Sequence, residues 1–149
     1  MSDRTLVHVS RLGIRWADMD ELGHVNNAVY FTYMENARLD WLREIGCAPD
    51  PQGEGPVVVN ASCTFMKQLK YPGDVEVRML VGEIGRSSIQ TWQEIRRVDQ
   101  PSVLCAQGAA KVVWVNYLLE RSQPLSEALR ARIMQPTQSV LDIGKVGAA

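Results

Sequence analysis

The sequence predicts an α+β fold in which one long helix packs against a curved antiparallel sheet. One strand-like segment comes first, a strongly apolar helical segment follows, and alternation of polar and apolar residues then continues over residues 57–117. Short turns join these later segments, and short turns connect antiparallel neighbours, because a parallel crossover needs about a dozen residues or more. The length of 149 residues is that of one ordinary domain, so we expect residues 1–149 to form a single domain.

The first element is a predicted strand over residues 6–16. Residues of one parity are apolar, while Arg11 and Arg15 have the other parity, a pattern that indicates a half-buried strand. The residues expected on its buried face are Leu6, Leu12, Ile14 and Trp16.

The second element is a predicted helix that begins with Asn26 or Asn27 as its cap and ends near Ile45. Asparagine is a favoured N-cap residue, and Gly46 is a typical C-terminal stop. Apolar residues recur at a spacing of three to four, so this helix needs burial along much of its surface. The residues that define its buried face are Tyr30, Met34, Ala37, Trp41 and Ile45.

The remaining chain is predicted to form a four-strand antiparallel meander after a loop over residues 47–56. Residues with strong turn propensity separate the segments. The predicted strands are 57–69, 75–81, 89–98 and 103–117. A short amphipathic helix over 126–134 follows, and residues 136–149 are expected to be a flexible tail.

Composition limits the classes of partner and the compartment. With 16 Lys and Arg against 17 Asp and Glu, the net charge is −1, which argues against a nucleic-acid-binding protein. Cys47, Cys63 and Cys105 are odd in number and widely spaced, so neither a disulfide framework nor a zinc ribbon is expected. The polar N-terminus and the lack of a long apolar run predict a soluble, cytoplasmic protein that has no membrane association.

The common hydrolase motifs are absent from the sequence. It contains no GxSxG, HExxH, Walker or GxGxxG motif, and its two histidines are His8 and His24. A Ser-His-Asp triad would have to use one of them, and His8 lies within the first predicted strand as an ordinary sheet residue.

The most informative segment lies immediately before the long helix, where Asp18 and Asp20 precede Gly23. A helix N-terminus presents unpaired N–H groups and a partial positive charge, so it can hold an anion or polarise a carbonyl oxygen. A nearby carboxylate could then act on the polarised carbon. Two alternatives remain open at this point: the aspartates are solvated turn residues, or a metal is bound by Asp18, Asp20, Glu21 and His24.

The motif Asp18-x-Asp20-x-x-Gly23-His24-Val25-Asn26-Asn27-x-x-Tyr30 resembles that of the 4-hydroxybenzoyl-CoA thioesterase family. The resemblance extends more loosely over residues 8–125. It implies the hot-dog fold, in which a five-stranded curved antiparallel sheet wraps one long central helix. It also implies an acyl-CoA thioesterase without a cofactor, active as a homodimer or homotetramer with sites between subunits.

By this resemblance, Asp20 is the catalytic nucleophile or general base, and Asp18 has a supporting role. The backbone N–H near Asn27 would hold the thioester carbonyl, and His24 would contact substrate or orient the loop. An aspartate is ionised at neutral pH, as both roles require. Further substrate-binding residues implied are Gly23, Val25, Asn26, Tyr30 and Arg86.

The substrate would be an acyl-CoA and one product coenzyme A, whose phosphates require local cations. Arg86 is the first candidate, and Lys67, Lys70 and Arg121 are weaker ones. The predicted acyl-pocket residues Ala61, Cys63 and Phe65 differ from those of the 4-hydroxybenzoyl-CoA enzyme, so aromatic specificity is not carried over.

Two other functions fit the same fold. The first is a noncatalytic module that binds acyl-CoA or an acyl carrier, and it predicts binding without turnover. The second is a dehydratase acting on a hydroxyacyl thioester, which would use a histidine with a carboxylate. His24 lies in a turn outside the long helix where that chemistry is usually found, so this interpretation ranks lower.

Overall fold

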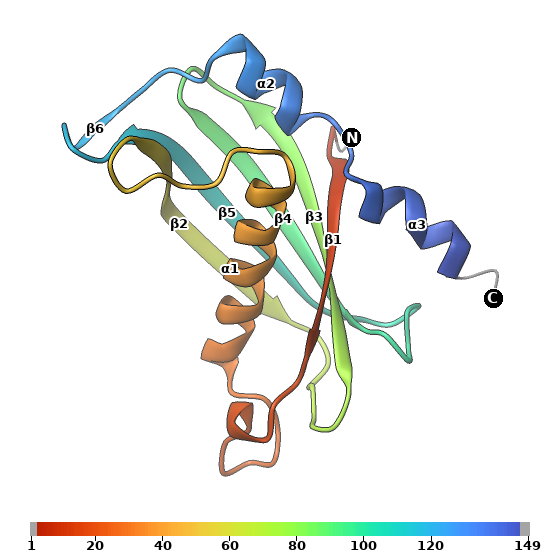
Figure 1. Ribbon diagram of the computed structural model, residues 1–149. Coiled ribbons are helices and arrows are strands. Elements are labelled where there is room, and N and C mark those ends of the chain that lie inside the picture. Colours follow the sequence, from red (N-terminus) through yellow and green to blue (C-terminus); the bar gives the residue numbers. More distant parts are fainter. Residues whose placement is uncertain (1–2, 147–149) are drawn as a thin grey trace.

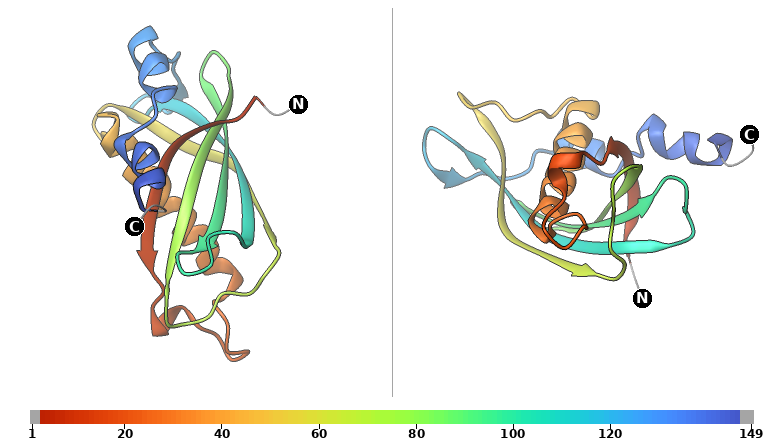
Figure 2. Two further views of the ribbon diagram at one scale, coloured as in Figure 1. Left: turned by 90° about the vertical axis from the view of Figure 1, so that its right-hand side faces the viewer. Right: turned by 90° about the horizontal axis from the view of Figure 1, so that it is seen from below.

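The computed structural model describes residues 3–146 and shows one antiparallel sheet that curves around a long helix (Figures 1 and 2). Two shorter helices follow the last long strand. In chain order the elements are β1 (Thr5–Gly13), the 3₁₀ helix η1 (Trp16–Asp18), α1 (Asn27–Glu44), β2 (Glu54–Phe65), β3 (Asp74–Ile84), β4 (Ser88–Arg97), β5 (Leu104–Asn116), β6 (Arg121–Ser122), α2 (Glu127–Ile133) and α3 (Gln138–Val146).

The strand order corrects the predicted meander. The long strands lie in the order β1-β3-β4-β5-β2, so β2 pairs with β5 and is not a neighbour of β3. The connection over residues 66–73 can span about 25 Å when extended, whereas three strand spacings need only about 14 Å. Eight residues are therefore enough to cross the sheet from β2 to β3. A connection with few residues does not require the two strands that it joins to be neighbours.

The sheet has six strands where the sequence predicted five. The additional strand, β6, is two residues long and pairs Ser122 with Val115 of β5. The first strand also ends earlier than predicted, and Trp16, which was expected to be buried, is 74% exposed in η1. The backbone N–H of Arg15 donates to Asp18 Oδ2 at 2.8 Å, which turns the chain into η1 and away from the sheet.

The buried face of α1 agrees with the helical pattern. Tyr30, Met34, Ala37 and Trp41 are all buried, and they pack against β3, β4 and β5 in two adjoining apolar clusters. Gly108 of β5 faces Met34 so closely that a larger residue there would collide with the Met34 sulfur. The concave side of the sheet and α1 therefore form the core.

The segment expected to be a flexible tail forms α3, which packs beside β1 (Figure 1). Thr137 N–H donates to the Val7 carbonyl, and Val9 N–H donates to Ser139 Oγ, both at 2.9 Å. The buried His8 ring lies between Thr137 Oγ1, at 2.7 Å, and Asp40 Oδ2, at 2.8 Å. These contacts cover the outer edge of β1; the end of the predicted tail, residues 147–149, lies outside the described residues.

None of the helices within residues 3–146 is long and apolar enough to cross a membrane.

Candidate active site

The loop before α1 forms a tight turn held by backbone hydrogen bonds. Asp20 N–H donates to the His24 carbonyl, and Gly23 N–H donates to the Asp20 carbonyl, each at 3.0 Å. Gly23 adopts a φ of 79°, a left-handed conformation that favours glycine. The Val25 N–H donates to the Leu69 carbonyl at 2.8 Å, which ties this turn to the chain that follows β2.

Asp18 is a buried anchor for this loop. Its side chain is 1% exposed and accepts four hydrogen bonds: from the Arg15 N–H, from Nε and Nη2 of the Arg15 guanidinium, and from the Tyr33 hydroxyl. Burial acts to raise the pKa of Asp18, but the bonds from Arg15 and Tyr33 outweigh it and hold the pKa below the ordinary value. The alternative that Asp18 is a solvated turn residue is therefore wrong.

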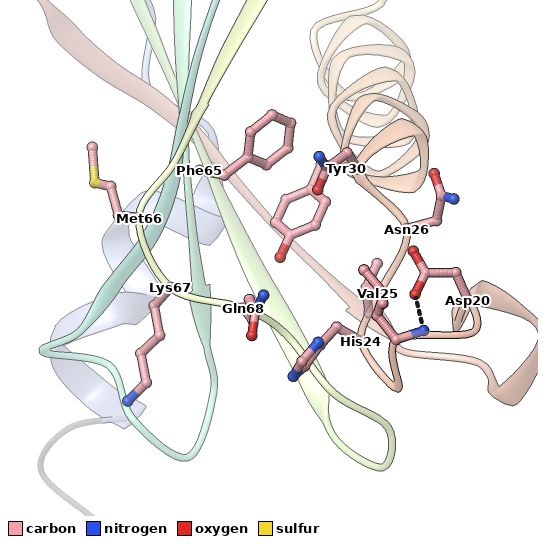
Figure 3. A pocket seen from close by; sticks show the side chains of 11 residues that line it. Asp20, His24, Val25, Asn26, Tyr30, Phe65, Met66, Lys67 and Gln68 are labelled. Atoms are coloured by element: carbon pink, nitrogen blue, oxygen red, sulfur yellow. Dashed lines mark hydrogen bonds between the residues drawn. The ribbon is translucent and has the colours of Figure 1, made fainter.

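Asp20, in contrast, lines an open cleft (Figure 3). Its Oδ1 accepts a hydrogen bond from the Leu22 N–H at 2.9 Å, which orients the carboxylate. The remaining oxygen has no hydrogen-bond partner among the described residues, so it is available to a ligand in the cleft.

The first turn of α1 offers a backbone amide to such a ligand. The Asn26 side chain caps the helix by accepting from the Ala28 N–H at 2.8 Å, and the Asn26 carbonyl accepts from the Val29 N–H at 2.9 Å. Asn27 N–H is the first amide of the helix, and such amides have no partner within a helix. Since Asn27 also lines the cleft, this N–H is placed to polarise a carbonyl oxygen there.

The cleft lies between the start of α1 and the chain that leaves β2, as Figure 3 shows. Its volume of about 760 Å³ suits a small-molecule ligand. Tyr30 links the two sides: its hydroxyl accepts from the Leu69 N–H at 3.1 Å, and its ring and that of Phe65 pack in a T-shaped arrangement with 4.9 Å between centroids. The lining residues are Asp20, Leu22, His24, Val25, Asn26, Asn27, Tyr30, Phe65, Met66, Lys67 and Gln68.

His24 carries an unpaired polar atom at this cleft. Its Nδ1 is buried and has no hydrogen-bond partner among the described residues. Buried polar groups are nearly always paired, so an unpaired one beside a cleft indicates a position that a ligand or water completes.

The structure brings together most of the predicted site residues. The candidates Ala61, Cys63, Lys70 and Arg121 do not line the cleft, and neither do Gly23 and Arg86. Gly23 shapes the turn and does not line the cleft. Arg86 lies in the β3–β4 turn beside α2, at the opposite end of the sheet from the start of α1 (Figure 1). Its carbonyl accepts from the Leu125 N–H at 2.9 Å, so the Arg86 backbone anchors the chain before α2.

Three lining residues were not predicted: Leu22, Met66 and Gln68. The predicted second strand extends to Leu69, which would make Met66 and Gln68 sheet residues. The strand ends at Phe65, and the following residues turn toward α1. The turn residues 71–74, which precede β3, were the sequence signal that could have indicated an earlier end for β2.

The structure does not favour a metal site. Across residues 3–146, no three His, Cys, Asp or Glu side chains lie close enough together to hold a metal ion. Cys47, Cys63 and Cys105 are free thiols.

Comparison with known proteins gives a consistent result. Residues 14–133 match the thioesterase-like superfamily. The structure is similar to that of the PA2801 protein of Pseudomonas aeruginosa, named as a candidate thioesterase, with 36% identity and a TM-score of 0.83 over 87% of this chain and 99% of that one. A Xanthomonas campestris protein named as a candidate acyl-CoA thioesterase has 29% identity and a TM-score of 0.72, over 80% of this chain and 99% of that one.

A curated relative is matched over a shorter stretch. YsmA of Bacillus subtilis, an uncharacterised protein, is 21% identical over 80 residues, which are 54% of each chain. The match thus spans about half the length of that relative.

Proposed function

Because the chain belongs to the thioesterase-like superfamily, we propose that it hydrolyses an acyl-CoA thioester to a free acid and coenzyme A. The observation that carries this proposal is the free oxygen of the Asp20 carboxylate, in one cleft with the first amide of α1. The pair supplies what acyl transfer needs, a base or nucleophile beside a donor for the oxyanion.

Asp20 acts in one of two ways in this proposal. As a nucleophile, it attacks the thioester carbon and expels the thiolate, and water then hydrolyses the resulting anhydride. As a general base, it takes a proton from water, which attacks the same carbon and expels the thiolate. A thiol has a pKa of roughly 8.5, so the thiolate leaves without a strong general acid. Asn27 N–H holds the negative charge that develops on the carbonyl oxygen.

The neighbouring residues position the substrate. The unpaired Nδ1 of His24 is suited to a hydrogen bond with the substrate or with the attacking water. Asn26 fixes the helix start, while Val25 and Tyr30 form the apolar wall against the acyl group. Gly23 contributes through the conformation of the turn.

We expect purified protein to release free thiol from a panel of aliphatic and aromatic acyl-CoAs, measured with a thiol reagent. Turnover of at least one member supports the proposal. Tight binding of coenzyme A thioesters without thiol release would instead identify a binding module, and hydration of an enoyl-CoA without thioester cleavage would identify a dehydratase.

We propose Lys67, in place of the distant Arg86, as the cation that contacts the phosphates of coenzyme A. It extends from the β2 side of the cleft and is the one cationic side chain among the lining residues (Figure 3). We expect Lys67→Ala to raise KM for acyl-CoA about fivefold with kcat unchanged, because one exposed charge contact is worth about 1 kcal/mol. Hydrolysis of an acyl-N-acetylcysteamine, which lacks phosphates, should not change.

Lys70→Ala is the matched control, because Lys70 is an exposed cation of the same connection that does not line the cleft. An equal increase in KM for both thioesters would remove Lys67 from phosphate binding.

We also propose that the active form is a homodimer or a tetramer of dimers joined at the edge of β2. The β1 edge is covered by the C-terminal segment, whereas no strand in the described structure pairs with the outer edge of β2. This edge exposes Val57, Val58 and Val59, the last by 55%. An open apolar edge is an association surface, and closed two-fold symmetry is the commonest way to cover one.

A further inference from the structure

The contact between α3 and β1 contains a histidine that joins a carboxylate to two hydroxyls. On one side of the His8 ring, Nε2 lies 2.8 Å from Asp40 Oδ2. On the other side, Nδ1 lies 2.7 Å from Thr137 Oγ1 and 3.2 Å from Ser139 Oγ. These side chains come from β1, α1 and the C-terminal segment, and none of them lines the cleft of Asp20. A hydroxyl, a histidine and a carboxylate in this order form the arrangement of a catalytic triad.

The hydrogen bonds decide which ring nitrogen of His8 can act as a base. Burial acts to raise the pKa of Asp40, but the bonds from Ser10 and His8 outweigh it and hold the pKa below the ordinary value. Asp40 is therefore ionised at neutral pH, and an ionised carboxylate only accepts hydrogen bonds. Neutral His8 thus carries its proton on Nε2 and presents an unprotonated Nδ1 to the two hydroxyls, as a general base must.

Ser139 is the hydroxyl that a ligand can reach. Thr137 is 7% exposed, whereas Ser139 is half-buried and lines a cavity beside α3. Ser139 Oγ accepts from the Val9 N–H at 2.9 Å, which holds it in position. Thr137 Oγ1 lies 2.7 Å from Ser139 Oγ, so the Ser139 proton can reach His8 through the Thr137 hydroxyl as well as directly.

The start of α3 adds donors beside the same hydroxyl. Gln138 and Ser139 supply the first two amides of this nine-residue helix, and such amides have no partner within a helix. They are placed to hold the negative charge that develops on a carbonyl oxygen when Ser139 attacks the adjoining carbon.

The cavity limits the size of the substrate. Its volume is about 260 Å³, which is below the usual range for drug-sized ligands and suits a short acyl group. Apolar side chains and one residue of each charge surround it. The lining residues are Val9, Arg11, Ser139, Asp142 and Ile143.

We infer that Ser139, His8 and Asp40 form a second hydrolytic site, which cleaves esters of short acyl groups. The Ser139 oxygen bonds to the acyl carbon, and the bond from that carbon to the alcohol oxygen breaks. His8 takes the Ser139 proton on Nδ1 and gives it to the departing alcohol, while Asp40 stabilises the charged ring. Water then cleaves the acyl-serine by the same steps, which releases the acid and restores Ser139. The site shares no residue with the cleft of Asp20, so this inference does not rest on the proposed thioesterase activity.

A fluorophosphonate probe, applied to the full chain, tests the nucleophile directly. Ser139 Oγ bonds to phosphorus, fluoride leaves, and the proton goes to His8. We expect peptide mass spectrometry to find the probe on Ser139 at least 100-fold faster than on Ser102, an exposed serine in a turn. Equal rates, or no adduct on Ser139, would overturn the inference and identify the hydrogen-bond network as a structural anchor of α3.

Variants of the other two residues separate catalysis from packing. His8→Gln keeps hydrogen-bonding groups but has no base, and Asp40→Asn keeps the size of the carboxylate but not its charge. Each should slow the labelling of Ser139 at least 100-fold. Glu44→Gln is the matched control, because Glu44 is an exposed acid one turn further along α1, and it should be labelled as the wild type is.

Hydrogen exchange checks that α3 stays in place in these variants. The Thr137 N–H donates to a carbonyl of β1, so its slow exchange reports a docked α3. A variant that keeps this protection and is still labelled at the wild-type rate would overturn the inference. If one variant loses the protection, the other decides.

The substrate class is tested by the acyl group left on Ser139. After brief incubation with p-nitrophenyl acetate, we expect mass spectrometry to find acetyl-Ser139. The octanoate ester should leave no octanoyl group there, because the cavity is too small for it. Octanoylation as fast as acetylation would contradict the assignment to short acyl groups. Peptide masses are measured in place of p-nitrophenol release, since the cleft of Asp20 could release p-nitrophenol as well.

Discussion

Asp20→Asn should lower kcat/KM for acyl-CoA hydrolysis by about 10³-fold, equivalent to about 4 kcal/mol of transition-state stabilisation. The amide keeps the size of the side chain and its bond to the Leu22 N–H, but it loses the negative charge that attacks carbon or accepts a proton. Steady-state thiol release measures the loss. We expect the decrease to appear in kcat and not in KM, because the missing interaction forms only in the transition state.

Glu21→Gln is the matched control for this prediction. Glu21 is an exposed acid next to Asp20 in the chain, and it does not line the cleft. Its variant should hydrolyse the substrate as the wild type does. Equal activity of the wild type and Asp20→Asn would remove Asp20 from the mechanism, even if the protein proved to be a thioesterase.

The two roles proposed for Asp20 can be separated by a single turnover in heavy-oxygen water. If Asp20 is the nucleophile and water then attacks the aspartyl carbon of the anhydride, the label enters the protein and the released acid is unlabelled. If Asp20 activates water, the label enters the acid and the protein stays unlabelled. Mass spectrometry of the intact protein and of the acid distinguishes these results.

Asp18→Ala should destabilise the fold by about 3 kcal/mol, because it leaves buried donors without their acceptor. The largest cost falls on the buried Tyr33 hydroxyl, which loses its hydrogen-bond acceptor, Asp18 Oδ2, at 2.7 Å. The exposed Arg15 guanidinium can rebond to water. Urea unfolding followed by circular dichroism measures the change. Asp3→Ala, at an exposed acid near the start of β1, should change stability little.

The same carboxylate predicts how stability depends on pH. Its pKa is lower in the folded protein than the ordinary value of 3.8, so the folded state binds the proton less well than the unfolded chain. The stabilisation from Asp18 is therefore fully present above about pH 4 and is lost as the pH falls through the folded-state pKa. The stability difference between wild type and Asp18→Asn should be constant from neutral pH to about pH 5 and shrink below pH 4. A difference that grew with acid would contradict this assignment.

The local arrangement of residues around the start of α1 could be predicted from the sequence. The periodicity of residues 27–44 places α1 and its buried face, and Asn26 caps it as its residue type predicts. Asp20, His24 and Asn27 lie within eight consecutive residues before and at this helix start, so their proximity in the cleft follows from chain connectivity. The resemblance to thioesterases rested on this same short segment, and the superfamily match agrees with it.

Interactions between distant segments could not be predicted in the same way. A period of two shows which residues share a face of a strand, but it carries no information about which strand lies alongside, so β2 was placed next to β3. The sequence does not show at which end of the sheet a turn lies. Arg86 was therefore predicted to lie at the substrate cleft, although its turn is at the opposite end of the sheet.

The sequence by itself determined α1, its cap and the acid that precedes it, because these depend on residues within about two helical turns of one another. Only the tertiary structure decided that Asp18 is buried against Tyr33, that Lys67 lines the same cleft as Asp20, and that the buried Nε of Arg38 has no hydrogen-bond partner among the described residues. Burial and hydrogen-bond pairing are properties of packed neighbours, and those neighbours are brought together by the folded sheet rather than by the order of the chain.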